Sequence, residues 1–232
     1  MADIIQIDSH TWRFEDDFVR FFLLEGTEKA ALIDSGANSP NALTLAKTLT
    51  DKPIILLNTH GDGDHISGTG AFSEIYMHES DYGRKVSSQF PDVVLIKVND
   101  NDVIDLGDRP VTAIHIPGHT YGSLAFLDAK ERVLYAGDSV QKGHIYMFGD
   151  HRDPKQFEAS LNKLIEMTDR FDKIYASHDE FCIPSDYIKK VKDAWIQVQN
   201  GNVTYEIIDL YGNHIKSYTT DICGFYMNEA IG

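Results

Sequence analysis

Four times in this chain, a short apolar run leads directly into a polar turn that holds histidine or aspartate. The run PIILLN precedes the turn NTHGDGDHISG at residues 58–68, and later runs precede the turns PGHTYGS, YAGDS and ASHDE. Short apolar runs bounded by turn residues predict buried strands. Helical patterns lie between them, for example at residues 154–167, where Phe157, Leu161 and Leu164 share one face. We therefore predict an α/β layered sandwich, not a helical bundle or an all-β barrel.

The rest of the chain continues this alternation of strands and helices. The predicted helices cover residues 41–49, 79–88, 154–167 and 185–199, with a further short helix after Ile66. The predicted strands cover residues 4–8, 18–25, 30–34, 53–58, 74–78, 93–98, 111–115, 123–127, 132–136, 172–177, 204–210, 214–218 and 223–226. Because no internal repeat, low-complexity tract or long linker interrupts the sequence, we expect a single domain over residues 1–232.

Charge and composition narrow the classes of partner. The formal net charge is −15, from 36 acidic against 21 basic residues, with no Lys/Arg-rich run. Such a surface repels phosphate backbones and anionic lipid, so we expect no nucleic-acid or membrane partner. The N-terminus does not resemble a secretory signal, which predicts a cytoplasmic protein. Cys182 and Cys223 have no C-x-x-C spacing, so neither a disulfide framework nor a zinc finger is indicated.

The turn at residues 58–68 holds two histidines and two aspartates within six positions. Gly61 and Gly63 separate them, so these side chains cannot share one helix face, but a tight loop can bring them to one point. Imidazole and carboxylate together form a ligand set for Zn, Fe or Mn. With the later turns, the candidate metal ligands are His60, Asp62, Asp64, His65, His119, Asp138 and His178.

These motifs, in this order, resemble the metallo-β-lactamase superfamily, whose signature is H-x-H-x-D-H followed by three further ligands. HGDGDH matches except at its third position, and His119, Asp138 and His178 lie in the three later turns. The resemblance implies an αββα four-layer sandwich with a dinuclear metal site at the shared edge of two sheets. It also implies that His60 and His119 hold metal one, that Asp64, His65 and His178 hold metal two, and that Asp138 bridges them.

The chemistry implied by the resemblance is hydrolysis by a hydroxide held between two divalent ions. Bound ions lower the pKa of water toward about 7 and polarise the bond under attack. Asp64 would be the catalytic residue that orients the hydroxide and passes its proton to the leaving group. We expect a metal-dependent hydrolase of a small-molecule ester, thioester, lactone or related substrate, similar to the glyoxalase II and lactonase branches.

Asp62 departs from the family signature, because it stands where a third histidine is common. As a ligand of metal one, its carboxylate would favour Fe or Mn over Zn. The flavodiiron reductases of this superfamily have Glu at this position, so the alternative function is a non-haem di-iron oxidoreductase. A degenerate binding protein is a third possibility, disfavoured by the six family-matching ligands.

Three weaker features have more than one interpretation each. Residues 143–152 form either part of a substrate pocket or an exposed polar loop, and Tyr121 is either an oxyanion donor or a packed side chain. The C-terminal aromatic residues predict strand packing, with a lid or a homodimer surface as alternatives; they are Tyr205, Tyr211, Tyr218, Phe225 and Tyr226.

Overall fold

Three β-sheets and the helices packed on them make up the computed structural model, which describes residues 2–229. The first sheet has seven strands in sequence order: β1 (Asp3–Asp8), β2 (Thr11–Asp16), β3 (Val19–Glu25), β4 (Ala30–Ile33), β5 (Ile54–Leu57), β6 (Glu74–Met77) and β7 (Val94–Lys97). Strands β1 to β4 pair antiparallel, whereas β4 to β7 pair parallel.

The second sheet has six strands in the order β14-β13-β11-β10-β9-β8. They are β8 (Val103–Asp105), β9 (Pro110–His115), β10 (Leu124–Asp128), β11 (Val133–Tyr135), β13 (Lys173–Tyr175) and β14 (Cys182–Pro184). A third sheet, in the order β12-β17-β16-β15, contains β12 (His144–Met147), β15 (Tyr205–Leu210), β16 (Asn213–Thr219) and β17 (Gly224–Asn228).

Helices cover the outer faces of the first two sheets. On the first sheet lie α1 (Ala42–Ala46), a 3₁₀ turn (Thr69–Ala71) and the segment formed by α2 (Glu79–Asp81), a π turn (Tyr82–Val86) and α3 (Ser87–Gln89). On the second lie α4 (Pro154–Glu166) and α5 (Tyr187–Gln199). Helix α4 begins sharply because the Asp153 carboxylate accepts hydrogen bonds from two amides of the first turn, and Pro154 occupies a position that needs no amide donor.

Strand β3 shows why the two large sheets stack face to face. Along a strand, successive side chains point to opposite faces. Phe21 and Leu23 pack in the outer core beneath α1, whereas Phe22 and Leu24 pack between the two sheets. All four side chains are fully buried, so both faces of this strand are covered. The predicted αββα sandwich is confirmed.

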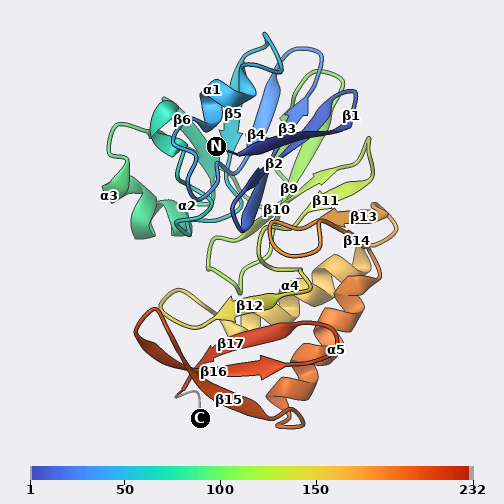
Figure 1. Cartoon of the computed structure of the whole chain (residues 1–232). Coiled ribbons are helices and arrows are strands. Elements are labelled where there is room, and N and C mark those ends of the chain that lie inside the picture. Colours follow the sequence, from blue (N-terminus) through green and yellow to red (C-terminus); the bar gives the residue numbers. More distant parts are fainter. Residues whose placement is uncertain (1, 230–232) are drawn as a thin grey trace.

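The third sheet adds a layer beyond the sandwich. Figure 1 shows β15 to β17, in red, beside α4 and α5. Phe225 of β17 packs against Trp195 of α5, with ring centroids 5.1 Å apart, and both are fully buried. This sheet therefore shares its core with the helices that cover the second sheet.

The predicted elements differ from the observed ones in informative places. Strand β12 was predicted as part of a loop or pocket segment; it pairs with β17, about 80 residues later, which no local pattern reveals. Strands β2, β8 and β14 were also missed. The helix predicted over residues 79–88 is interrupted by the π turn, which places Arg84 and Lys85 in its middle. Within residues 2–229, no helix is long and apolar enough to cross a membrane.

Candidate metal centre

The candidate site lies where strands of both large sheets end. Asp34 follows β4 and His60 follows β5, and these two strands are parallel. In the second sheet, His119 follows β9, Asp138 follows β11 and His178 follows β13. Because these strands run in one direction, their carboxyl ends meet at one edge, as at ligand sites of other α/β sheets. The fold therefore brings the turns together at one edge of the sandwich, as predicted.

Six of the seven candidate residues form two groups that share one carboxylate. We call the group of His60, His119 and Asp138 the first position, and the group of Asp64, His65, Asp138 and His178 the second position; in each, the potential ligand atoms lie within 4.8 Å of one another. Asp138 Oδ2 is 3.9 Å from His60 Nε2 and 3.7 Å from His119 Nε2. Its Oδ1 is 3.1 Å from His65 Nε2 and 3.3 Å from His178 Nε2. One oxygen of Asp138 thus faces each position.

All four histidines are oriented through the same ring nitrogen. Nδ1 of His65 is 2.9 Å from Asp34 Oδ2, Nδ1 of His119 is 2.9 Å from the Tyr146 carbonyl, and Nδ1 of His178 is 2.8 Å from the Phe18 carbonyl. The fourth, His60, has its Nδ1 3.0 Å from the Thr59 hydroxyl. Carbonyl and carboxylate oxygens only accept, and the Thr59 hydroxyl spends its own proton on Asp34, so all four rings can donate from Nδ1 and direct Nε2 toward the two positions.

Two buried atoms at the second position point to a missing cation partner. His65 Nε2 and Asp138 Oδ1 are both buried and lie 3.1 Å apart, but neither makes a hydrogen bond of acceptable geometry with the other or with another described residue. Buried polar atoms are almost always paired in native proteins. An imidazole nitrogen and a carboxylate oxygen aimed at the same point fit a divalent transition-metal ion.

The charges of the cluster follow from its burial and its mixture of acids and bases. Burial alone would lower the pKa of His178, but the facing carboxylates of Asp138 and Asp64 outweigh it and raise that pKa to about 10. The same carboxylates and Asp34 raise the pKa of His65 despite its burial. At the first position, burial and the nearby charge of Arg152 lower the pKa of His119 to about 4. The second position therefore carries protons that an ion must displace, whereas His119 is already neutral.

Asp62 lies beside the first position but outside both groups. Its Oδ2 is 3.3 Å from His119 Nε2 and 3.6 Å from His60 Nε2. Both of its oxygens also accept from arginines: Oδ1 from Arg84 and Oδ2 from Arg152, each at 2.6 Å. Burial would raise the pKa of Asp62, but the adjacent imidazoles of His119 and His60 and the charge of Arg152 hold it well below its usual range. Asp62 is thus an ionised carboxylate with two cationic partners.

Two carboxylates that hold the site together had no role in the sequence analysis. Asp34 accepts hydrogen bonds from Thr59 through its backbone amide and hydroxyl, besides orienting His65. Asp81, fully buried on α2, accepts from the amides of Gly61 and Gly122 and so joins the first motif to the His119 turn. The ALIDSG run at the end of β4 was a signal for Asp34. No local pattern marked Asp81.

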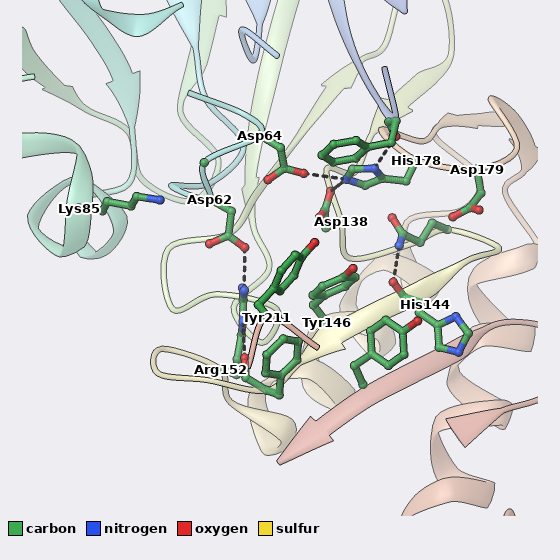
Figure 2. Close-up of a pocket in the computed structure, with 15 residues that line it drawn as sticks. Asp62, Asp64, Lys85, Asp138, His144, Tyr146, Arg152, His178, Asp179 and Tyr211 are labelled. Carbon is green, nitrogen blue, oxygen red and sulfur yellow. Dashed lines mark hydrogen bonds and ion pairs between the residues drawn. The ribbon is translucent and has the colours of Figure 1, made fainter. Parts of the chain in front are cut away.

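A cavity of about 730 Å³ opens in front of the two positions. Asp62, Asp64, Asp138 and His178 form one wall (Figure 2). The opposite wall is aromatic and comes mainly from the third sheet and the segment around β12; its rings are Tyr146, Phe148, Tyr211 and Tyr226. Phe18 also lines the cavity, but its ring stacks beside His178, with centroids 6.0 Å apart. In Figure 2, the Tyr146 and Tyr211 rings point toward Asp138. The third sheet therefore shapes the pocket.

The two alternatives for residues 121 and 143–152 can be compared with this cavity. His144, Tyr146, Phe148 and Arg152 line it, which agrees with the pocket interpretation of the segment. Tyr121 is not among the lining residues, and its ring packs edge-on against His151 at 5.6 Å. With 45% of its surface exposed, Tyr121 is not a buried, packed side chain either, so the structure agrees fully with neither interpretation of this residue.

Comparison with known proteins agrees with the motifs and the fold. A sequence profile of the Metallo-beta-lactamase superfamily matches residues 15–178. Acyl-coenzyme A thioesterase MBLAC2 of Bos taurus is 26% identical, with 73% of this chain and 78% of that protein covered. Hydroxyacylglutathione hydrolase of Bdellovibrio bacteriovorus is 29% identical, with 73% of this chain and 68% of that protein covered. The solved metallo-beta-lactamase from Pontibacter korlensis superposes with a TM-score of 0.72 at 15% identity, covering 84% of this chain and 99% of that one.

The chain belongs to the metallo-beta-lactamase superfamily. Within that superfamily, it is a metal-dependent hydrolase.

Metal binding at the second position is expected to release protons. With the pKa of His178 raised to about 10, the metal-free protein holds this proton at pH 7.5, and the raised pKa of His65 acts in the same direction. An ion requires the His178 Nε2 unprotonated, so we expect at least about one proton released per ion, and an affinity that rises roughly tenfold per pH unit below pH 10 for the His178 proton. Calorimetric titration in buffers of different ionisation enthalpy measures this number. Heat independent of the buffer would contradict the protonated state.

Proposed function

We propose that this chain hydrolyses a small acyl compound, an ester, thioester or lactone, with divalent metal ions held at the first and second positions. The observation that carries the proposal is the orientation of the four histidines, whose Nδ1 atoms are occupied and whose Nε2 atoms face a shared carboxylate. Bound there, such ions would lower the pKa of a water molecule and polarise an acyl carbonyl.

The chain's own groups have separate tasks in this proposal. His60, His119 and Asp138 would hold the first ion, and Asp64, His65, Asp138 and His178 the second. The free edge of the Asp64 carboxylate lines the cavity, so it can take a proton from the attacking water and pass it to the leaving group. Asp34 keeps the His65 ring in place from behind.

The cavity and the relatives together favour acyl thioesters among these substrates. The names of the two relatives describe enzymes that act on acyl compounds, one of them a thioesterase. The aromatic wall of Tyr146, Tyr211 and Tyr226 offers an apolar surface with polar rims, which suits the apolar part of an acyl group. Tyr211 stands at the turn between β15 and β16, outside the residues that the family profile matches. We infer that this hairpin contributes to the choice of acyl group.

The alternative function, a di-iron oxidoreductase, was motivated by an additional carboxylate ligand from Asp62. Arg84 and Arg152 already engage both oxygens of that carboxylate. Its negative charge is therefore matched by protein cations, so Asp62 gives no reason to prefer iron at the first position. Hydrolysis remains the proposal.

The test combines metal analysis with a substrate panel. Protein purified without added metal is analysed for bound elements, reconstituted with Zn(II), Mn(II) or Fe(II), and assayed on short acyl thioesters, esters and lactones. We expect hydrolysis that depends on the ion, and loss of both activity and an ion in His178→Ala. The exposed His214 lies outside the cavity, so His214→Ala is the matched control and should change neither. Absence of bound metal after reconstitution, or bound metal without acyl hydrolysis, would overturn the proposal.

A further inference from the structure

The two positions differ in the charges around them. No lysine or arginine forms an ion pair with Asp64 or Asp138 among the described residues, so the carboxylates of the second position face only histidines. Beside the first position lie two guanidinium groups, those of Arg84 and Arg152. Their side chains are only 13% and 10% exposed, so water screens these charges weakly.

Arg152 contacts the nitrogen that points to the first position. Its Nη1 is 3.1 Å from His119 Nε2, and its Nη2 donates to Asp62 Oδ2 at 2.6 Å. The guanidinium is anchored further by the carbonyls of His119 and Phe148. Because arginine remains protonated and has no acceptor atom, its contact with Nε2 can only be donation to the lone pair of that nitrogen. A metal ion at the first position needs the same lone pair.

Asp62 explains why a guanidinium is stable at this place. A third histidine here would be neutral and would give Arg152 no anionic partner. The aspartate supplies two oxygens, one for each arginine, and its side chain is only 19% exposed. Hydrogen bonds between such buried ionised partners are among the stronger ones in proteins. The aspartate at the third motif position and the two arginines therefore form one unit.

We propose that Arg152 is a built-in cation that competes with a metal ion for the first position, so that the protein holds one ion tightly at the second position and another only weakly at the first. The inference deepens the proposed function and rests on it, since it presupposes that the second position binds metal. In this arrangement, the guanidinium, which also lines the cavity, supplies positive charge where the first ion would otherwise supply it.

The test measures metal binding directly, by native mass spectrometry and by equilibrium dialysis against buffered Zn(II). In the parent protein, we expect one ion bound at low free Zn(II) and a second at least about 10-fold weaker. Arg152→Met should tighten the second binding step by about 10- to 100-fold, the size of effect typical of groups that contact metal ligands, and leave the first step unchanged. Adding His60→Ala to Arg152→Met should abolish the ion gained, because His60 belongs only to the first position.

Lys85→Met is the matched control. Lys85 is a cation that lines the same cavity, yet it forms no ion pair with Asp62 within residues 2–229, so its loss should leave both binding steps as in the parent. If Arg152→Met fails to fold, as judged by circular dichroism, Arg152→Lys serves instead and should tighten the second step by a smaller factor, because lysine cannot contact Asp62 and His119 with a planar fork.

Each outcome decides one of the two proposals. Two ions of equal affinity in the parent, or an unchanged second step in the Arg152 variants, would overturn the competition. An equal gain from Lys85→Met would assign the effect to general charge and overturn it as well. Absence of any bound ion in the parent after reconstitution would instead overturn the proposed function, and with it the basis of this inference.

Discussion

Replacement of Asp64 with asparagine is expected to lower kcat by at least about 100-fold while the protein keeps its fold and its bound metal. The side chain is isosteric, and its amide oxygen can still contact an ion, but the amide cannot accept and return a proton. A positioned acid–base group contributes about 10²- to 10⁴-fold. Asp64 faces the cavity, and its Oδ2 is 3.3 Å from His178 Nε2, so the carboxylate is at the second position and within reach of a substrate.

The measurement is kcat on the best acyl thioester of the panel, with elemental analysis of the same samples. Asp150→Asn is the control, because Asp150 is exposed and does not line the cavity. It should show the parent's kcat. Full turnover in Asp64→Asn at equal metal content would remove Asp64 from the proton transfer, and loss of the metal would show that Asp64 acts mainly as a ligand.

The second large effect is expected on stability, at the edge of the sandwich opposite the candidate site. Arg109, at the start of β9, is 3% exposed and donates from Nε to the fully buried Asp128 at 2.8 Å. Its Nη1 also reaches the carbonyls of His10 and Glu25 on the first sheet, at 2.7 and 3.1 Å. Arg109→Met leaves Asp128 as a buried charge without its partner, which should lower the free energy of unfolding by about 3–5 kcal/mol.

Denaturant unfolding measures this change, with two comparisons. The double variant Arg109→Met/Asp128→Leu removes both charges and should recover much of the loss, because no unpaired charge remains. Arg132→Met removes an exposed pair with Asp172 and should change the free energy of unfolding far less, because water and salt screen that pair. If Arg109→Met costs no more than Arg132→Met, the buried pair does not join the sheets in the way described.

The sequence alone determined the parts of this protein that depend on local pattern. Apolar runs that end in polar turns predicted the strands that precede His60, His119, Asp138 and His178. Such runs are continuously apolar because both faces of the strand are buried, as in β3. His60, Asp64 and His65 fall in one short turn, so their proximity needs no knowledge of the fold. The order of the four motifs was enough to indicate the superfamily.

The tertiary structure decided which cations surround these residues. Asp62 was interpreted as a candidate metal ligand because it occupies the third position of the family signature, but its partners Arg84 and Arg152 lie 22 and 90 residues further along the chain. Arg84 reaches it from a π turn inside a segment predicted as a regular helix, and Arg152 from the loop after β12. Neither placement follows from periodicity, because both depend on how loops of different sheets pack at one edge.

The pocket's aromatic wall was likewise beyond local inference. The sequence predicts the C-terminal strands close to their observed ranges, but it does not distinguish strand packing from a lid or a dimer surface as the role of their aromatic residues. Pairing of β17 with β12 in parallel carries the β15–β16 turn and Tyr211 to the cavity. Strand pairing between segments about 80 residues apart is set by the shared core with α4 and α5. Strand propensity determines where a strand forms, whereas the packing of the whole chain determines which other strand it pairs with.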